Sequence, residues 1–326
     1  MVVKRVFLGL VCLVVNSLVG SWSYAGTSAL GVSDGGVIRL AKQMSALSNQ
    51  QSQTPLDLRL PNNHNNSLIK WFDAVGPRRD TDSFGELVLR AALVQLSKPY
   101  KRQDKRNDEQ ENSAIDINTF QCVSLLEGAL ALARCTWMDQ RNRDCFIAEV
   151  ERSRYQGGVR KDYASRLHYF TDWLYDNVER DRMQFLSSEM GGRAVSTEFW
   201  YMTENPNRYP PLANVETRAQ IKQVERRLSG HRPIVVDRDN LFAAQRQLRA
   251  GDIVAIVGSK PGLLVTHVGI VHYGGDSRPQ LLHASSYHKR ILVTTGDIYN
   301  YVIRRPERRG IMAARPLPPV LFGTPQ

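Results

Sequence analysis

The order of helical and β-rich segments along the chain is the feature that most restricts its fold. In the first part of the chain, apolar residues recur at helical spacing, at residues 84–96, 123–133, 167–178 and 217–228. From residue 232 on, short apolar runs are separated by turn-forming residues, and they lie at residues 233–236, 253–257, 267–273, 280–284 and 290–294. Helices followed by strands are typical of an α+β domain rather than of a βαβ sheet. We therefore predict an α+β fold with an antiparallel meander of about four to five strands.

Composition narrows the class of protein further. The 326 residues are 42% hydrophobic and 23% charged, which is typical of a globular chain with a sizeable core and excludes a disordered or collagen-like one. The formal net charge of +11 permits contact with polyanions. Because the Lys and Arg residues are spread along the chain instead of forming one basic block, we expect no nucleic-acid partner.

The N-terminus has the pattern of a secretory signal peptide. Lys4 and Arg5 precede an apolar stretch at residues 6–19, and Ser23-Tyr24-Ala25 reads as a small-x-small cleavage site. A membrane anchor is the alternative, but the stretch of about 14 residues is shorter than the roughly 20 that span a bilayer. We expect residues 1–25 to be removed, no transmembrane span in the mature chain, and a periplasmic or secreted protein of a Gram-negative type of bacterium.

Three cysteines follow the predicted cleavage site, so an exported chain would retain at least one free thiol. Cys135 and Cys145 flank a polar stretch at residues 138–144 that reads as a turn. They suit either a short disulfide loop or two buried free thiols. In both cases Cys122 needs a separate explanation.

Cys122 stands immediately before the apolar segment 123–133, which is predicted to be a buried helix. At a helix N-terminus, unpaired N–H groups and the helix dipole favour the reactive thiolate and can hold an oxyanion. A buried structural cysteine is the alternative. The sequence has no G-x-S-x-G, H-E-x-x-H, Walker A or G-x-G-x-x-G motif that would indicate another chemistry.

A thiol nucleophile needs an imidazole that accepts its proton and later protonates the leaving amine. His267 and His283 fall in neighbouring predicted strands, so His283 could orient His267. His272 is an odd number of residues from His267 and belongs on the other face of the strand. His168 falls in the aromatic segment 167–178, where packing is an equal explanation. A zinc site built on His267, His283 and a carboxylate is a rival, although no metal-ligand spacing supports it.

At several blocks the sequence resembles a known family. These blocks are Leu-Ser-Lys-Pro-Tyr at 96–100, Thr-Phe-Gln-Cys-Val-Ser-Leu-Leu-Glu at 119–127, the central block 154–173, Leu-Arg-Ala-Gly-Asp at 248–252, Leu-Val-Thr-His-Val-Gly at 264–269, and Leu-His-Ala-Ser-Ser at 282–286. They resemble the NlpC/P60 superfamily of cysteine peptidases and amidases, and more narrowly the bacterial family catalogued as DUF1460. The resemblance runs in order from about residue 84 to 315.

The resemblance implies a papain-like fold, with the nucleophile at the start of a central helix packed on an antiparallel sheet. It implies Cys122 as nucleophile, His267 as general base and acid, and His283 as the orienting residue, with the Tyr100 hydroxyl near the thiolate or the oxyanion. Candidate substrate contacts come from the central block, although packing explains them equally well; they are Arg166, Tyr169, Asp172 and Trp173. The family usually has Asp before the nucleophile, where this chain has Gln121. We expect activity to survive this difference.

The activity implied by the resemblance is hydrolysis of the amide between N-acetylmuramic acid and L-alanine in peptidoglycan or muropeptides. Cleavage of the stem peptide after γ-D-glutamate and a non-catalytic wall-binding module are the alternatives. We expect a signal peptide at residues 1–25, an N-terminal arm or cap with extra helices at 26–80, and a catalytic domain at 81–320. A monomer without metal or cofactor is expected.

Overall fold

The computed structural model describes residues 64–101, 115–275 and 277–321. The predicted signal peptide and a helix expected near residues 37–47 lie outside this part of the chain. None of the helices that the structure describes has both the length and the apolar character needed to cross a bilayer.

A mixed structure of helices and one antiparallel sheet confirms the predicted α+β class. In the described residues the sheet has eight strands in the order β2-β3-β8-β4-β5-β6-β7, with β1 paired to β8. The strands are β1 Met183–Phe185, β2 Arg193–Ala194, β3 Ile234–Asp237, β4 Ile253–Gly258, β5 Val265–Tyr273, β6 Pro279–Ser285, β7 Arg290–Asp297 and β8 Arg308–Pro316. The predicted meander is β4 to β7. The prediction missed that β8 inserts between β3 and β4, since only long-range pairing decides where a last strand joins a sheet.

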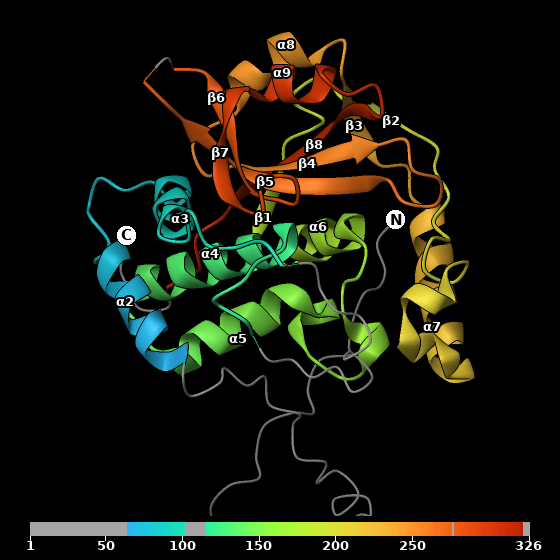
Figure 1. Cartoon of the computed structure of the whole chain (residues 1–326), viewed down its shortest axis with the longest axis horizontal. Helices are drawn as coiled ribbons and strands as arrows, with labels where there is room; N and C mark the ends of the chain where they lie inside the picture. Colours follow the sequence, from blue (N-terminus) through green and yellow to red (C-terminus); the bar gives the residue numbers. More distant parts are fainter. Residues whose placement is uncertain (1–63, 102–114, 276, 322–326) are drawn as a thin grey trace, which may run out of the picture. The chain divides into compact units, whose positions relative to one another are not determined.

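Helices cover both faces of this sheet (Figure 1). They are α2 Asn65–Val75, α3 Phe84–Leu93, α4 Cys122–Trp137, α5 Arg143–Arg154, α6 Phe170–Glu179, α7 Val215–Ser229, α8 Leu241–Ala244 and α9 Ile298–Ile303. Alternate residues of a strand point to opposite faces. Accordingly Ile270 of β5 packs in the core with α3 and α4, whereas Val271 packs in a second core with α8 and α9.

Helix α4 lies at the centre of the larger core. Every residue from Leu125 to Thr136 is buried, which agrees with a segment that is apolar on nearly all sides. Its one buried carboxylate, Glu127, accepts hydrogen bonds from Arg154 of α5, with Nη2 2.7 Å from Oε2. The buried charge is therefore paired where the helix contacts its neighbour.

Two helices differ from the sequence-based expectation. Helix α5 was not predicted, because its many charged residues obscure the apolar face; Asn142 caps it by accepting the Cys145 N–H at 3.0 Å. Helix α6 begins at Phe170, so His168 precedes the helix, and its Nε2 lies 2.7 Å from the Tyr163 carbonyl oxygen.

Helix α2 lies within the range that the sequence assigned to an arm or cap. Its apolar face is closely packed, because Leu68, Trp71, Phe72 and Val75 are buried in the same core as α3 and α4. Apolar residues at helical spacing form one stripe, and burial of that stripe explains the close packing.

Cys135 and Cys145 form a disulfide, which decides between the two alternatives that the sequence left open. The bond joins the last turn of α4 to the first turn of α5. It therefore closes the connection between two helices that pack against each other.

We predict that replacing both cysteines by alanine lowers the free energy of unfolding by about 2–3 kcal/mol, because the unfolded chain loses a short covalent loop. Urea titration followed by circular dichroism measures the change. Cys122→Ser, which removes a thiol outside the loop, serves as the control. Equal stability of the double variant and the wild type would contradict the prediction.

Candidate active site

Cys122 is the first residue of α4, as the sequence predicted. The chain enters this helix through Gln121, whose extended backbone is held by the Ser124 hydroxyl: the Gln121 N–H donates to Ser124 Oγ at 2.9 Å. Ser124 Oγ in turn donates to the Gln121 carbonyl at 3.2 Å. These local bonds stabilise the turn that presents the thiol at the helix N-terminus.

Tyr100 lies beside the segment that leads to Cys122. The Phe120 N–H donates to the Pro99 carbonyl at 3.0 Å, and the Lys101 N–H donates to the Phe120 carbonyl at 3.1 Å. The Tyr100 N–H also donates to the Lys289 carbonyl at 2.9 Å, in the turn between β6 and β7. Tyr100 is thus held between the segment that leads to Cys122 and the turn between β6 and β7.

The Cys122 thiol packs against β5, where the backbone at Val268 contacts it next to His267. Burial raises the pKa of the thiol above its ordinary value of 9.0, although hydrogen bonds from the backbone of Val268, Val123 and Cys122 oppose this. The N–H groups at the helix N-terminus therefore do favour the thiolate, but removal of water from the thiol outweighs them and the net shift of its pKa is upward.

His267 and His283 are brought together by the pairing of β5 with β6. His267 Nε2 lies 2.7 Å from His283 Nδ1, and the rings are nearly perpendicular at 86°. His272 is elsewhere, with its Nδ1 3.2 Å from Gln280 Oε1. The structure thus brings together the two histidines that the sequence selected.

Both imidazoles are neutral near pH 7. Burial, together with the positive charge of Arg308, lowers the pKa of His267 to about 3 and that of His283 to about 4, and His283 also contributes to the lowering at His267. Of two neutral imidazoles in contact, one donates its N–H and the other accepts. If His267 carries its proton on Nε2 and donates to His283, its Nδ1 is free to act as a base.

Two residues at this site were missed by the sequence analysis. The Tyr301 ring, at the C-terminal end of α9, lies 5.4 Å from the His283 ring and 6.3 Å from the His267 ring, between centroids. The Arg308 guanidinium lies 3.8 Å from the centroid of the Tyr301 ring. No motif distinguishes either residue, since Tyr301 reaches the histidines through the packing of α9 on the sheet and Arg308 through the start of β8.

Three of the predicted substrate contacts are buried, and two of them bond to helix α7. The Tyr169 hydroxyl donates to Glu225 of α7 at 2.6 Å, and Arg227 of α7 donates to Asp172 at 2.9 Å. Trp173 is 1% exposed and stacks on Phe170. Only Arg166 is partly exposed among the predicted contacts. Packing, the alternative explanation for this block, therefore accounts for Tyr169, Asp172 and Trp173.

In the described ranges, no group of three or more His, Cys, Asp or Glu residues is arranged to hold a metal ion. In particular, the zinc site proposed on His267 and His283 lacks a carboxylate as third ligand there. The two imidazoles instead direct nitrogen atoms at each other.

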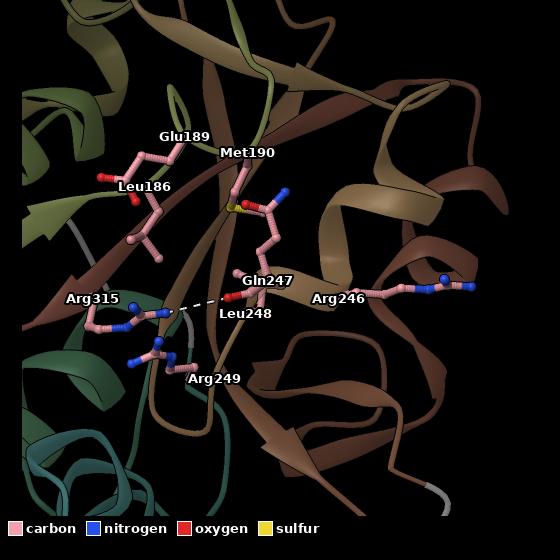
Figure 2. A pocket seen from close by; sticks show the side chains of 8 residues that line it. All are labelled: Leu186, Glu189, Met190, Arg246, Gln247, Leu248, Arg249 and Arg315. Carbon is pink, nitrogen blue, oxygen red and sulfur yellow. Dashed lines mark hydrogen bonds between the residues drawn. The ribbon is translucent and has the colours of Figure 1, made fainter.

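A pocket of about 380 Å³ lies away from these residues (Figure 2). Its lining includes Glu189, Arg249 and Arg315, and Arg315 is already paired with Asp252 at 2.8 Å. The pocket lies near the start of β4. His267 pairs with Ile256 near the end of β4, so the histidines lie at the opposite end of this strand. We therefore do not place the chemistry in this pocket.

A family model matches the part of the chain that carries these residues. Residues 92–311 match the AmiA-like family, described as N-acetylmuramoyl-L-alanine amidase-like, and the chain belongs to this family. No curated protein has a matching sequence.

Solved structures from two genera resemble the chain. An N-acetylmuramoyl-L-alanine amidase from Bacteroides uniformis ATCC 8492 shares 28% identity at a TM-score of 0.65, covering 72% of this chain and 98% of that one. A candidate xylanase from Bacteroides fragilis shares 30% sequence identity at a TM-score of 0.62, and the match covers 69% of this chain and 98% of that one. A Legionella pneumophila protein of the DUF1460 family shares 15% sequence identity at a TM-score of 0.59, and the match covers 79% of this chain and 96% of that one. At this identity the similarity shows the fold alone.

The raised pKa of Cys122 predicts the pH dependence of its alkylation. The rate of labelling by iodoacetamide should rise through a midpoint above pH 9, because the thiolate forms only there. The rate constant at Cys122 is measured by mass spectrometry from pH 6 to 10, beside a free thiol with a midpoint of about 8.5. A midpoint below that of the free thiol would contradict the prediction.

The lowered pKa values of the two histidines predict an acid-sensitive fold. Since unfolding returns each imidazole to about 6.5, the unfolded chain binds more protons, and stability falls as the pH drops from about 6.5 toward 4 and 3. Each histidine contributes a slope of up to about 1.4 kcal/mol per pH unit. Urea titrations at several pH values should show a smaller slope in His267→Gln/His283→Gln than in the wild type. Equal slopes would contradict the prediction.

Proposed function

We propose that the protein is a cysteine amidase that hydrolyses the amide between N-acetylmuramic acid and L-alanine in peptidoglycan or muropeptides. One observation carries the proposal: the thiol at the start of α4 packs against β5 beside a histidine that is paired with a second histidine at 2.7 Å. Membership of an N-acetylmuramoyl-L-alanine amidase-like family supports the bond that is cut.

The arrangement also supports a papain-like fold of the NlpC/P60 type. Its nucleophile begins a buried helix, and that helix packs on an antiparallel sheet that carries the base. The α2 helix and the segment before α7 would then be additions around this core. Fold similarity alone does not decide the chemistry, so the assignment depends on the geometry of Cys122 and the histidine pair.

In the proposed first step, His267 Nδ1 accepts the thiol proton while Cys122 Sγ attacks the carbonyl carbon of the muramoyl group. The carbonyl oxygen becomes an oxyanion, which backbone N–H groups at the start of α4 stabilise. The C–N bond then breaks as the imidazolium protonates the nitrogen of L-alanine. The peptide leaves with a free amino group, and the sugar remains as a thioester on Cys122.

In the second step, His267 removes a proton from water as its oxygen attacks the thioester. The C–S bond breaks, the thiol regains its proton from the imidazolium, and the muramic acid leaves as a free carboxylic acid. His283 accepts the Nε2–H of His267 throughout and so selects the tautomer that presents Nδ1. Because both imidazoles are neutral at rest, the proton moves during the attack and not before it.

The disulfide between Cys135 and Cys145 supports an exported protein, since such bonds persist mainly in oxidising compartments. Together with the N-terminal segment at residues 1–25, it favours the periplasm or the exterior of the cell. Peptidoglycan and its fragments are accessible in these compartments.

The description of the Bacteroides fragilis relative as a candidate xylanase is not carried over to this chain. Glycoside hydrolysis ordinarily uses two carboxylates on opposite sides of the scissile bond. The groups assembled here are the thiol of Cys122, the imidazoles of His267 and His283, and the phenol of Tyr301. They suit attack on a carbonyl carbon.

The test is mass spectrometry of purified muropeptides after incubation with the mature chain. We expect the intact stem peptide with a free L-alanine amino group, and a sugar that has lost its peptide. Cys122→Ala should lower the rate at least about 10³-fold, and His283→Gln about 10²-fold, because the latter removes only the orienting partner.

The same assay distinguishes the alternatives. A shortened stem still attached to the sugar would move the assignment to a stem-peptide endopeptidase. Activity that survives in Cys122→Ala but is lost on chelation would indicate metal chemistry. No product with any muropeptide would favour a wall-binding module. Cys135→Ala/Cys145→Ala, which keeps Cys122, controls for loss of stability.

A further inference from the structure

Helix α9 is held against the sheet at its N-terminal end. Asp297 caps the helix by accepting the Asn300 N–H at 2.7 Å, and Gln245 accepts the Tyr299 N–H at 2.9 Å. Ile298 and Val302 are fully buried in the core on this face of the sheet. The backbone that carries Tyr301 is therefore fixed from two sides.

The Tyr301 side chain packs against both histidines. Its ring is tilted by 66° to the His283 ring at 5.4 Å and by 33° to the His267 ring at 6.3 Å. The thiol of Cys122 is close enough to affect Tyr301 electrostatically. The phenol ring thus contacts the pair from α9, on the side away from the strand backbone.

Arg308, the first residue of β8, holds Tyr301 in turn. Its guanidinium lies over the ring at 3.8 Å from the centroid, and its Nη1 donates to the Tyr301 carbonyl oxygen. A cation over an aromatic face is attracted by the negative π-surface. The two contacts fix both the ring and the backbone of Tyr301.

We propose that Tyr301 and Arg308 form a positioning pair that keeps His267 and His283 in contact with each other. This inference rests on the proposed function. A carboxylate as third residue would hold an imidazolium by charge, but a neutral His283 does so only weakly. The orientation of His267 must then come from packing, and Tyr301 supplies the surface for it.

Arg308 also affects the protonation of the two histidines. Its positive charge opposes protonation of both histidines, so the hydrogen bond between them survives below the pH at which an exposed histidine is half protonated. The other charged or titratable groups that act on this cluster are Cys122 of α4, His288 of the β6–β7 turn and Arg305 after α9. Of these groups, Arg308 alone acts on both histidines.

The test compares Tyr301→Leu, Tyr301→Phe and Arg308→Gln with matched controls. The controls are Tyr299→Leu, which removes an aromatic ring of the same helix that contacts Phe242 instead, and Arg309→Gln, which removes the neighbouring exposed cation. The histidine titrations are followed by NMR of the imidazole nitrogens in a Cys122→Ala background. This readout requires no substrate and no activity.

We expect the pKa of His267 and His283 to rise by about one pH unit or more in Tyr301→Leu and in Arg308→Gln, through entry of water in the first and loss of a charge in the second. Tyr301→Phe and both controls should leave the titrations unchanged. In the enzyme with Cys122 present, Tyr301→Leu should lower kcat about 10- to 100-fold with little change in KM, because misplacement of a catalytic group affects the chemical step. The acid limb of kcat/KM should move to higher pH in Arg308→Gln.

Unchanged titrations in Tyr301→Leu and Arg308→Gln would overturn the proposal, whether or not the chain proves to be an amidase. A decrease in kcat in Tyr301→Phe as large as that in Tyr301→Leu would also overturn the proposal, because the Tyr301 hydroxyl would then act directly in the reaction. If the titrations shift as expected and no muropeptide is cleaved, the positioning pair stands and the proposed reaction fails. Circular dichroism of each variant confirms that it is folded.

Discussion

The burial of α4 against the sheet is the constraint on which the rest of the structure depends. A helix that is apolar on nearly every side cannot lie on a surface, so α3, α5 and the sheet must cover it. Its position fixes where its N-terminus meets β5, and hence where the Cys122 thiol lies. The same burial removes water from the thiol and raises its pKa.

Charged groups around α4 are buried in pairs, which gives the helix layer a defined arrangement. Glu149 of α5 lies 2.8 Å from Arg134 of α4 and 2.9 Å from Arg182 before β1, and these partners hold its pKa below the usual range despite burial. Removing one member of such a cluster would leave an uncompensated buried charge. The network therefore ties α4 and α5 to the start of the sheet, as the disulfide does at their connection.

The histidine pair shows how low polarity determines the proposed mechanism. Among the residues that the structure describes, no carboxylate acts on His267 or His283 to stabilise an imidazolium, and Arg308 opposes one. The resting state is thus a neutral thiol beside neutral imidazoles. Charge develops only when a carbonyl substrate supplies the compensating oxyanion, so the proton transfer is coupled to the attack.

Local patterns in the sequence determined α4 and the strands β4 to β7, because apolar periodicity and turn residues act over short distances. They also placed Cys122 at the start of α4, and His267 and His283 on neighbouring strands. Tertiary structure decided the rest. It inserted β8 between β3 and β4, buried Tyr169, Asp172 and Trp173 away from solvent, and brought Tyr301 and Arg308 to the histidines. It also reversed the expected sign of the thiol pKa, since desolvation depends on every segment that packs around a group and not on its neighbours in the chain.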